Sequence, residues 1–327
     1  MPTTLSHSDG RLTINEIASG RFLITAEPSD RSKYIAIRSL ETSYPIELIE
    51  KIFGIKGPSW VCDEIARDED PNYVSQYLIN EVLAYFEPAI LERVRILDFG
   101  CGSGASTAIL ARQFPASQIV GVELSDELLS IAKARADLYN LKNVQFFRSP
   151  SGMELPDGLG EFDLAIMSAV YEHLLPEERP AIMKNVWKLV KKGGYLFMNQ
   201  TPNRLFPIEL HTTLLPFINY LPDRLAHWYA RNFSKRIGRN ETWESLLREG
   251  IRGATVSEIS KRLSNGETSA EILQPLLDRD RIDLWFESTN PEHLRSVKLV
   301  AKHGLKLFNR LTGICLVPDL SLAFRKK

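Results

Sequence analysis

Short apolar runs separated by helix-like segments dominate the stretch from residue 91 to residue 204. The apolar runs at 96–97, 118–122, 143–147, 162–168 and 195–198 predict five strands. Two segments of helical composition, 105–114 and 180–189, lie between them. Strands that alternate with helices favour an α/β fold on a mostly parallel sheet. We therefore expect residues 91–204 to form a doubly wound core.

The flanking segments predict additions to this core. Residues 1–90 form an expected N-terminal extension, with strands at 11–14 and 21–25, a turn at 18–20, and helices at 46–53 and 70–86. Residues 205–280 are rich in proline, aromatic residues and leucine, and predict an insertion with helices at 224–233 and 256–263. Residues 281–327 are expected to complete the sheet with strands at 282–286 and 320–325. We interpret the insertion as a substrate-binding cap at the carboxyl edge of the sheet.

The most informative motif follows the first predicted strand of the core. Asp98 ends that strand, and Gly100, Gly102 and Gly104 follow at every second position. Glycine permits a positive φ and lets the backbone approach a ligand without a Cβ in the way. Glu123 ends the next strand, where its carboxylate can accept hydrogen bonds from a ribose diol. The order is strand, glycine turn, helix, strand and acid.

The spacing D-x-G-x-G-x-G resembles that of the class I S-adenosylmethionine (SAM)-dependent methyltransferases, most closely the type 11 and type 12 groups. Dinucleotide folds use G-x-G-x-x-G, and an acid beside their pyrophosphate would be repelled. The resemblance implies a Rossmann-like, seven-stranded sheet with an antiparallel last strand. It also implies that SAM is the cofactor and S-adenosylhomocysteine the product. The implied cofactor-binding residues are Asp98, Phe99, Gly100, Cys101, Gly102, Gly104, Glu123, Leu124 and Ser168.

The third strand departs from the family pattern. The family places an Asp after it to hold the adenine amino group, and Ser151 stands there in this chain. The Ser151 hydroxyl can accept one hydrogen bond, and the backbone of Gly152 or Met153 could meet the adenine ring. Tyr73, in the extension, is a further candidate to touch the cofactor or to pack on the sheet. After the fourth strand, Glu172-His173-Leu174 is a frequent signature of the family.

Composition excludes several classes of protein. The chain of 327 residues has a net charge of −1, which argues against binding to nucleic-acid phosphates. Three widely spaced cysteines suit a reducing cytoplasm, and Cys101 is expected to be a small filler. The N-terminus is polar and no apolar stretch approaches 18 residues, so we expect neither a signal peptide nor a membrane span.

Methyl transfer from a sulfonium is an in-line displacement, and an alcohol acceptor must also lose its proton to a base. His211 is the candidate base; Glu209, two residues earlier, would orient its ring if the segment is extended. His173 is a second candidate base or a substrate contact, with a structural role as the alternative. Asn203 and Arg204 could hold the acceptor. The spacing of His and Cys predicts no metal site.

These residues predict a SAM-dependent methyltransferase that acts on a hydroxyl oxygen of a small or carrier-linked acceptor. The string T-P-N-R, followed by Glu and His, is similar to methyltransferases associated with glycan or secondary-metabolite modification, so a saccharide is favoured. One alternative is C- or N-methylation of a lipid, quinone or secondary metabolite. Another is a SAM-binding scaffold without catalysis. An NAD-dependent dehydrogenase is disfavoured, because its third glycine comes later than the third glycine of this chain.

Overall fold

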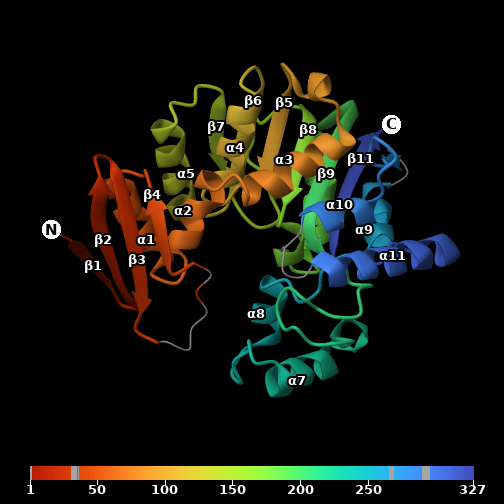
Figure 1. Ribbon diagram of the computed structural model, residues 1–327. Helices are drawn as coiled ribbons and strands as arrows, with labels where there is room; N and C mark the ends of the chain where they lie inside the picture. The colour runs from red at the N-terminus through yellow and green to blue at the C-terminus, as the bar shows by residue number, and fades with distance from the viewer. Residues whose placement is uncertain (1, 31–34, 36, 265–268, 289–294) are drawn as a thin grey trace. The chain divides into compact units, whose positions relative to one another are not determined.

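The computed structural model divides the chain into two compact units, which contain a four-stranded and a seven-stranded sheet (Figure 1). The first unit consists of Met1–Tyr77 and Cys101–Arg148, and the second of Leu78–Gly100 and Ser149–Lys327. The structure describes residues 2–30, 35, 37–264, 269–288 and 295–327.

The four-stranded antiparallel sheet belongs to the first unit and has the order β1-β2-β3-β4. Leu12, Ile14 and Ile24 are buried because successive side chains of a strand point to opposite faces. They pack in one apolar core with helices α1 and α2. The strands and first helix predicted for the extension are confirmed. The bounds are β1 Thr3–His7, β2 Gly10–Ala18, β3 Arg21–Pro28, β4 Ser39–Thr42, α1 Ile46–Lys56 and α2 Val61–Glu69.

The rest of the first unit is a β-α-β segment of the larger sheet. Strand β6 (Gln118–Glu123) pairs in parallel with β7 (Val144–Arg148), and α5 (Asp126–Leu138) connects them. Helix α4 (Ala105–Gln113) precedes β6. Ser125 caps α5 by accepting a hydrogen bond from the Leu128 N–H at 3.2 Å.

The larger sheet has the order β10-β11-β9-β8-β5-β6-β7. In the second unit, β8 lies in parallel between β5 and β9, while β11 is antiparallel to both β9 and β10. This confirms the predicted seven-stranded, mostly parallel α/β sheet with an antiparallel end. The bounds are β5 Arg95–Phe99, β8 Phe162–Ser168, β9 Val190–Pro202, β10 Ala270–Ile272 and β11 Asp319–Lys326.

Most helices of the second unit either connect strands of the larger sheet or belong to the insertion. At the end of α3, the Tyr85 hydroxyl donates to the Ser321 carbonyl at 2.6 Å, and Phe86 stacks edge-on against Tyr195. The insertion has a small apolar core of its own around Ile218, Ala226 and Leu246. The bounds are α3 Val74–Tyr85, η1 Pro88–Leu91, η2 Tyr171–His173, α6 Glu178–Leu189, η3 Ile218–Tyr220, α7 Asp223–Phe233, α8 Trp243–Arg248, α9 Val256–Leu263, α10 Arg281–Ser288 and α11 Arg295–Thr312.

The strand predicted at 282–286 is wrong, because these residues form helix α10. The Asp280 carboxylate accepts hydrogen bonds from the N–H groups of Ile282 and Asp283, both at 2.9 Å, and so caps a helix. A short apolar run does not distinguish a strand from a buried helix by its pattern alone. The strand that pairs with β11 at this edge is β10 instead.

Two further boundaries differ from expectation. The strand predicted at 195–198 is longer in the structure, because β9 runs from Val190 to Pro202. Pairing with β11 reaches Pro202 and lengthens the strand. Helix α3 begins at Val74 rather than at residue 70, because the Asp70 carboxylate accepts from the Asn72 N–H in a turn. No helix within the described residues is long and apolar enough to cross a membrane.

Candidate active site

The glycine turn has the backbone geometry that its sequence predicts. Gly100, Gly102 and Gly104 have φ values of 71°, 54° and 81°, in the region that favours glycine. A Cβ on Gly104 would lie 2.6 Å from the Ala132 Cβ, while one on Gly102 would meet nothing within 4 Å. Gly104 is therefore required for packing on α5, and Gly102 leaves open space beside the backbone.

Glu123 faces this turn within the first unit. Its Oε2 accepts a hydrogen bond from the Gly102 N–H at 3.0 Å, and its Oε1 accepts from Leu124 and Ser125 at 2.8 and 3.0 Å. The carboxylate is thus held in place by three backbone donors and keeps further lone pairs for hydroxyl groups of a ligand. Cys101 is buried and its Sγ would be 2.9 Å from a Cβ on Gly121, as expected of a small filler.

A buried arginine that the sequence analysis overlooked supports the same turn. Arg135 on α5 is fully buried, and its Nη1 donates to the Ser103 carbonyl at 2.7 Å. The same guanidinium lies 3.1 Å from the Asp68 carboxylate and 3.4 Å from that of Glu64. Along the sequence, Arg135 looks like a solvent-facing residue of an amphipathic helix, so only the packed structure reveals this role.

In the second unit, the residues before the turn end strand β5. Asp98 and Phe99 are buried, and Asp98 lies opposite Ile166 of β8 in the ladder. A Cβ on Gly100 would lie 2.7 Å from Val170, which comes shortly after Ser168 at the end of β8. Both strands therefore end at this edge, as parallel pairing requires.

The loop around Ser151 is held by local contacts. The Ser151 hydroxyl donates to Glu154 at 3.2 Å and accepts from the Met153 N–H at 3.3 Å. A Cβ on Gly152 would be 2.9 Å from Glu178, so this glycine fits a tight approach. The hydroxyl proposed for adenine is thus already bonded to a carboxylate, and the Met153 side chain is exposed.

Tyr73 is tied to helix α2 within the first unit. Its hydroxyl donates to Asp63 at 2.8 Å, and its ring meets Tyr77 edge-on. Burial, reinforced by Asp63, raises the pKa of Tyr73. These contacts hold Tyr73 against helix α2, and its contact with the cofactor stays a prediction.

The two candidate histidines come together in the second unit. The ring centroids of His173 and His211 are 5.8 Å apart, and Nε2 of His173 lies 3.8 Å from Oε1 of Glu172. Nδ1 of His173 is 2.6 Å from the Arg248 carbonyl at the end of α8. A carbonyl only accepts hydrogen bonds, so Nδ1 carries the proton and Nε2 keeps its lone pair. We call Glu172, His173 and His211 the histidine cluster.

Burial sets the protonation of the histidine cluster. It raises the pKa of Glu172 to about 8, although Thr201 donates to the carboxyl at 3.3 Å. Oε1 of Glu172 has no hydrogen-bond partner among the described residues. Burial also lowers the pKa of His173. Burial lowers the pKa of His211 as well, together with the repulsion that would arise if both rings were protonated. Both imidazoles are therefore neutral near pH 7 and able to accept a proton.

Glu209 does not orient the His211 ring through a hydrogen bond, contrary to expectation. Its carboxylate accepts from the N–H groups of His211, Thr212 and Thr213 at 2.7, 2.8 and 2.5 Å, and from the Thr213 hydroxyl at 2.6 Å. The segment forms a turn here instead of an extended strand, so the Glu209 carboxylate accepts hydrogen bonds from the backbone rather than from the ring. Glu209 fixes the turn that carries His211 and contributes only its charge to the ring.

The side chain of Asn203, which was expected to hold the methyl acceptor, is already hydrogen-bonded to the backbone. Its amide donates to the carbonyls of Cys315 and Val317 at 3.2 and 2.9 Å, and its oxygen accepts from the Leu205 N–H at 3.0 Å. Asn203 thus joins β9 to the segment before β11. Arg204 is half-buried, and its N–H donates to the Ala254 carbonyl at 2.9 Å. Burial, together with the nearby Arg204 charge, lowers the pKa of Arg252.

Gly250 is a supporting residue that sequence reasoning missed. The N–H groups of Gly250 and Ile251 donate to the carbonyls of Leu247 and Leu246, a Schellman end to α8. Gly250 has a φ of 93°, and a Cβ there would lie 2.9 Å from the His211 ring and 3.1 Å from Glu172. The glycine that ends the helix also lets the histidine cluster close.

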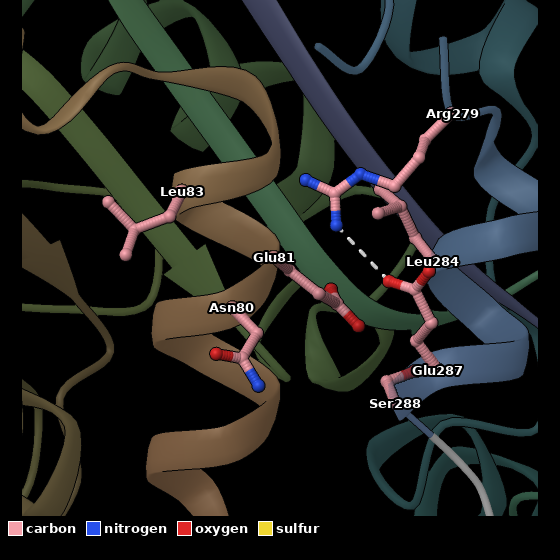
Figure 2. Close-up of a pocket in the computed structure, with 7 residues that line it drawn as sticks. All are labelled: Asn80, Glu81, Leu83, Arg279, Leu284, Glu287 and Ser288. Carbon is pink, nitrogen blue, oxygen red and sulfur yellow. Dashed lines mark hydrogen bonds and ion pairs between the residues drawn. The ribbon is translucent and has the colours of Figure 1, made fainter. Parts of the chain in front are cut away.

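A separate cavity of about 360 Å³ lies between α3 and α10 (Figure 2). Glu81 points into it from α3, while Arg279 and Glu287 form an ion pair at 3.2 Å on the opposite wall. Burial raises the pKa of Glu81 to about 7. The full lining is Asn80, Glu81, Leu83, Arg279, Leu284, Glu287 and Ser288, and includes no member of the histidine cluster.

Part of the chain is similar to known methyltransferases. Residues 96–194 match a family model described as a methyltransferase domain. The chain is 29% identical over 133 residues to the demethylmenaquinone methyltransferase of Lactococcus lactis, covering 40% of this chain and 52% of that protein. It is 27% identical over 110 residues to the ubiquinone biosynthesis O-methyltransferase of Acinetobacter baumannii, covering 34% of this chain and 44% of that protein.

The chain thus spans about half the length of these curated relatives. Among solved structures, PKMT2 from Rickettsia typhi aligns at a TM-score of 0.46 and 18% identity, covering 77% of this chain and 52% of that one. The left-handed glycines, the Glu123 carboxylate beside them and the matched family model lead to one conclusion. Residues 96–194 form a class I, SAM-dependent methyltransferase domain.

Proposed function

We propose that this protein transfers the methyl group of SAM to a hydroxyl oxygen of a small or carrier-linked acceptor. The observation that carries the proposal is the histidine cluster, in which two neutral imidazoles face each other 5.8 Å apart beside a buried carboxyl group. Glu172 and His173 follow strand β8 directly, and ligands of α/β sheets bind beyond the carboxyl ends of the strands.

In this mechanism His211 acts as the general base. SAM, when bound, would supply an activated methyl group to the acceptor oxygen and would leave as S-adenosylhomocysteine. The hydroxyl proton passes to Nε2 of His211 and then to solvent. His173 assists by position, because the Arg248 carbonyl fixes its tautomer. A base of this kind contributes about 10²–10⁴-fold to the rate.

The cofactor is proposed to bind at the glycine turn. The open space beside Gly102 fits a close approach to the ligand, and Glu123 offers acceptors to a ribose diol. Asp98 and Ser168 end their strands at the same edge within the second unit, as a cofactor-binding role requires. For the adenine we propose the backbone of Gly152 and Met153, since the Ser151 hydroxyl is bonded to Glu154.

The acceptor is proposed to be a saccharide hydroxyl, on the strength of the T-P-N-R segment. One observation favours the rival, an apolar acceptor such as a lipid or quinone methylated at carbon or nitrogen. Three large apolar side chains of the insertion are more than half exposed: Phe217 at 61%, Leu225 at 54% and Trp228 at 58%. Such side chains suit contact with an apolar acceptor better than with a polar one.

The three free cysteines support a reducing, cytoplasmic location.

The test begins with calorimetric titration of the full chain with S-adenosylhomocysteine, using NAD as control. We expect micromolar affinity for the former alone. An acceptor screen with sugar nucleotides and glycans, then with quinones and lipids, follows. His211→Ala should lower turnover by about two orders of magnitude while S-adenosylhomocysteine affinity stays within a few-fold. Unchanged turnover would remove His211 from the mechanism, and a folded protein that binds no S-adenosylhomocysteine would favour a scaffold.

A further inference from the structure

The histidine cluster contains three groups with the geometry of metal ligands. One ligand atom from each of Glu172, His173 and His211 can be chosen so that all three lie within 4.8 Å of one another. The residues come from two segments, 172–173 after β8 and 211 after β9, which explains why no ligand spacing is visible in the sequence. We propose that the histidine cluster binds a divalent transition-metal ion of the zinc class.

The buried carboxyl group is the first support for this site. Glu172 is fully buried, yet its Oε1 has no hydrogen-bond partner among the described residues and points to the cluster, 3.8 Å from His173 Nε2. A buried polar atom without a partner costs free energy, about 1–3 kcal/mol in a typical protein. A bound cation would supply the missing partner.

The orientation of His173 is the second support. Its Nδ1–H donates to the Arg248 carbonyl at 2.6 Å, which leaves the Nε2 lone pair directed away from the helix end. Metal-ligating histidines are typically held in this way, with the other ring nitrogen bonded to a carbonyl or carboxylate. Glu178 holds Arg248 in turn with two hydrogen bonds of 2.6 Å, so the orienting carbonyl is itself fixed.

The ligand types select the metal. Two imidazoles and one carboxylate suit zinc and its first-row neighbours, whereas magnesium and calcium prefer oxygen ligands. The His173 side chain is 44% exposed and His211 also reaches the surface. With only three protein ligands, of which the two imidazoles reach the surface, a coordination position is left for water or a substrate oxygen, which is the pattern of a catalytic rather than a structural site.

The inference does not rest on the proposed methyl transfer, because metal binding is measured without cofactor or acceptor. The two roles of His211 exclude each other at one moment: a metal on its Nε2 leaves no lone pair for a proton. If a chelator abolishes turnover while S-adenosylhomocysteine still binds, the metal activates the acceptor. If turnover survives chelation, His211 acts as the base.

The experiment is a calorimetric titration of the metal-free full chain with Zn²⁺ at pH 7.5. We expect one equivalent to bind, and His173→Asn, His211→Asn and Glu172→Gln each to weaken binding by at least about tenfold. The matched control is His303→Asn. That exposed histidine also places Nδ1 against a carbonyl, of Leu299 at 2.7 Å, but lies on α11, outside the cluster.

The result that overturns the site is equally clear. It is absence of stoichiometric binding, binding that any one of the three variants leaves unchanged, or a loss of equal size in His303→Asn. Circular dichroism of each variant checks the fold. Should buried Glu172→Gln fail to fold, the two histidine variants decide, because both side chains reach the surface. The visible spectrum of the Co²⁺-loaded protein provides a second readout and should lack thiolate bands.

Discussion

A buried network in the first unit and two buried carboxyl groups in the second treat charge in opposite ways. In the first, Arg135 is fully buried among Glu64 and Asp68, and donates further hydrogen bonds to Tyr44 and Ser103. In the second, Glu81 and Glu172 are buried with no lysine or arginine paired to their carboxyl groups among the described residues. The network of the first unit neutralises its charges with partners, whereas burial raises the pKa values of Glu81 and Glu172.

The pKa values express this difference. Burial alone would raise the pKa of Glu64, but Arg135, Arg67 and Lys56 outweigh it and lower the pKa. Burial raises the pKa of Glu172 to about 8 and that of Glu81 to about 7. Buried charges with partners stabilise one local structure: here Arg135 holds the glycine turn by donating to the Ser103 carbonyl. Uncompensated carboxyl groups keep the capacity to exchange a proton or to meet a cation, and such groups cluster at functional sites.

The sharpest way to break the comparison is to remove the cation of the first unit. Arg135→Met should lower the free energy of unfolding by about 3–5 kcal/mol, because it leaves Glu64 and Asp68 without their buried partner. Urea denaturation measures the change. The control is Arg148→Met, since Arg148 pairs with Asp126 at the surface, with both side chains more than half exposed, and such pairs contribute about 0–1 kcal/mol. A loss below 1 kcal/mol for Arg135→Met would mean that the network is not stabilising.

The second prediction concerns pH and Glu81. Its folded pKa of about 7 lies above the ordinary value of 4.5 for a glutamate side chain, so the folded state binds the proton more tightly than the unfolded state. Its contribution is complete below pH 4.5 and is lost as the pH rises to 7, by up to about 3 kcal/mol. Glu81→Gln should flatten this part of the stability profile. Urea midpoints between pH 4.5 and 8 measure it, and an unchanged slope would contradict the assignment.

The smallest expected effect comes from the glycine behind the histidine cluster. Gly250→Ala places a methyl group against the His211 ring at a φ of 93°, which should cost about 1–2 kcal/mol of stability. Turnover should also fall, because the added methyl group displaces the His211 ring from its position in the histidine cluster. The matched control is Gly313→Ala, where φ is 73° but a Cβ meets nothing within 4 Å. Equal losses of turnover in both variants would show that only backbone strain matters.

Local chemistry made the methyltransferase domain predictable from the sequence. Asp98, the three glycines and Glu123 lie within 26 residues, and glycine conformation and strand order follow from neighbouring residues. The strands at 162–168 and 320–325 were also predictable, because a buried strand needs a continuous apolar run. The element at 282–286 was not predictable, since a short segment with four apolar residues fits either a strand or a helix, and the Asp280 cap that decides for the helix shows only in the structure.

The sequence alone determined the cofactor class and the α/β sheet, because both are written in short segments whose residues act on their neighbours. Only the tertiary structure decided the use of the polar side chains. It bonded Glu209 and Asn203 to the backbone, buried Arg135 beneath the glycine turn, and brought Glu172 and His173 to His211 across 38 residues of chain. Contacts between distant segments depend on how helices and strands pack, which no local pattern encodes.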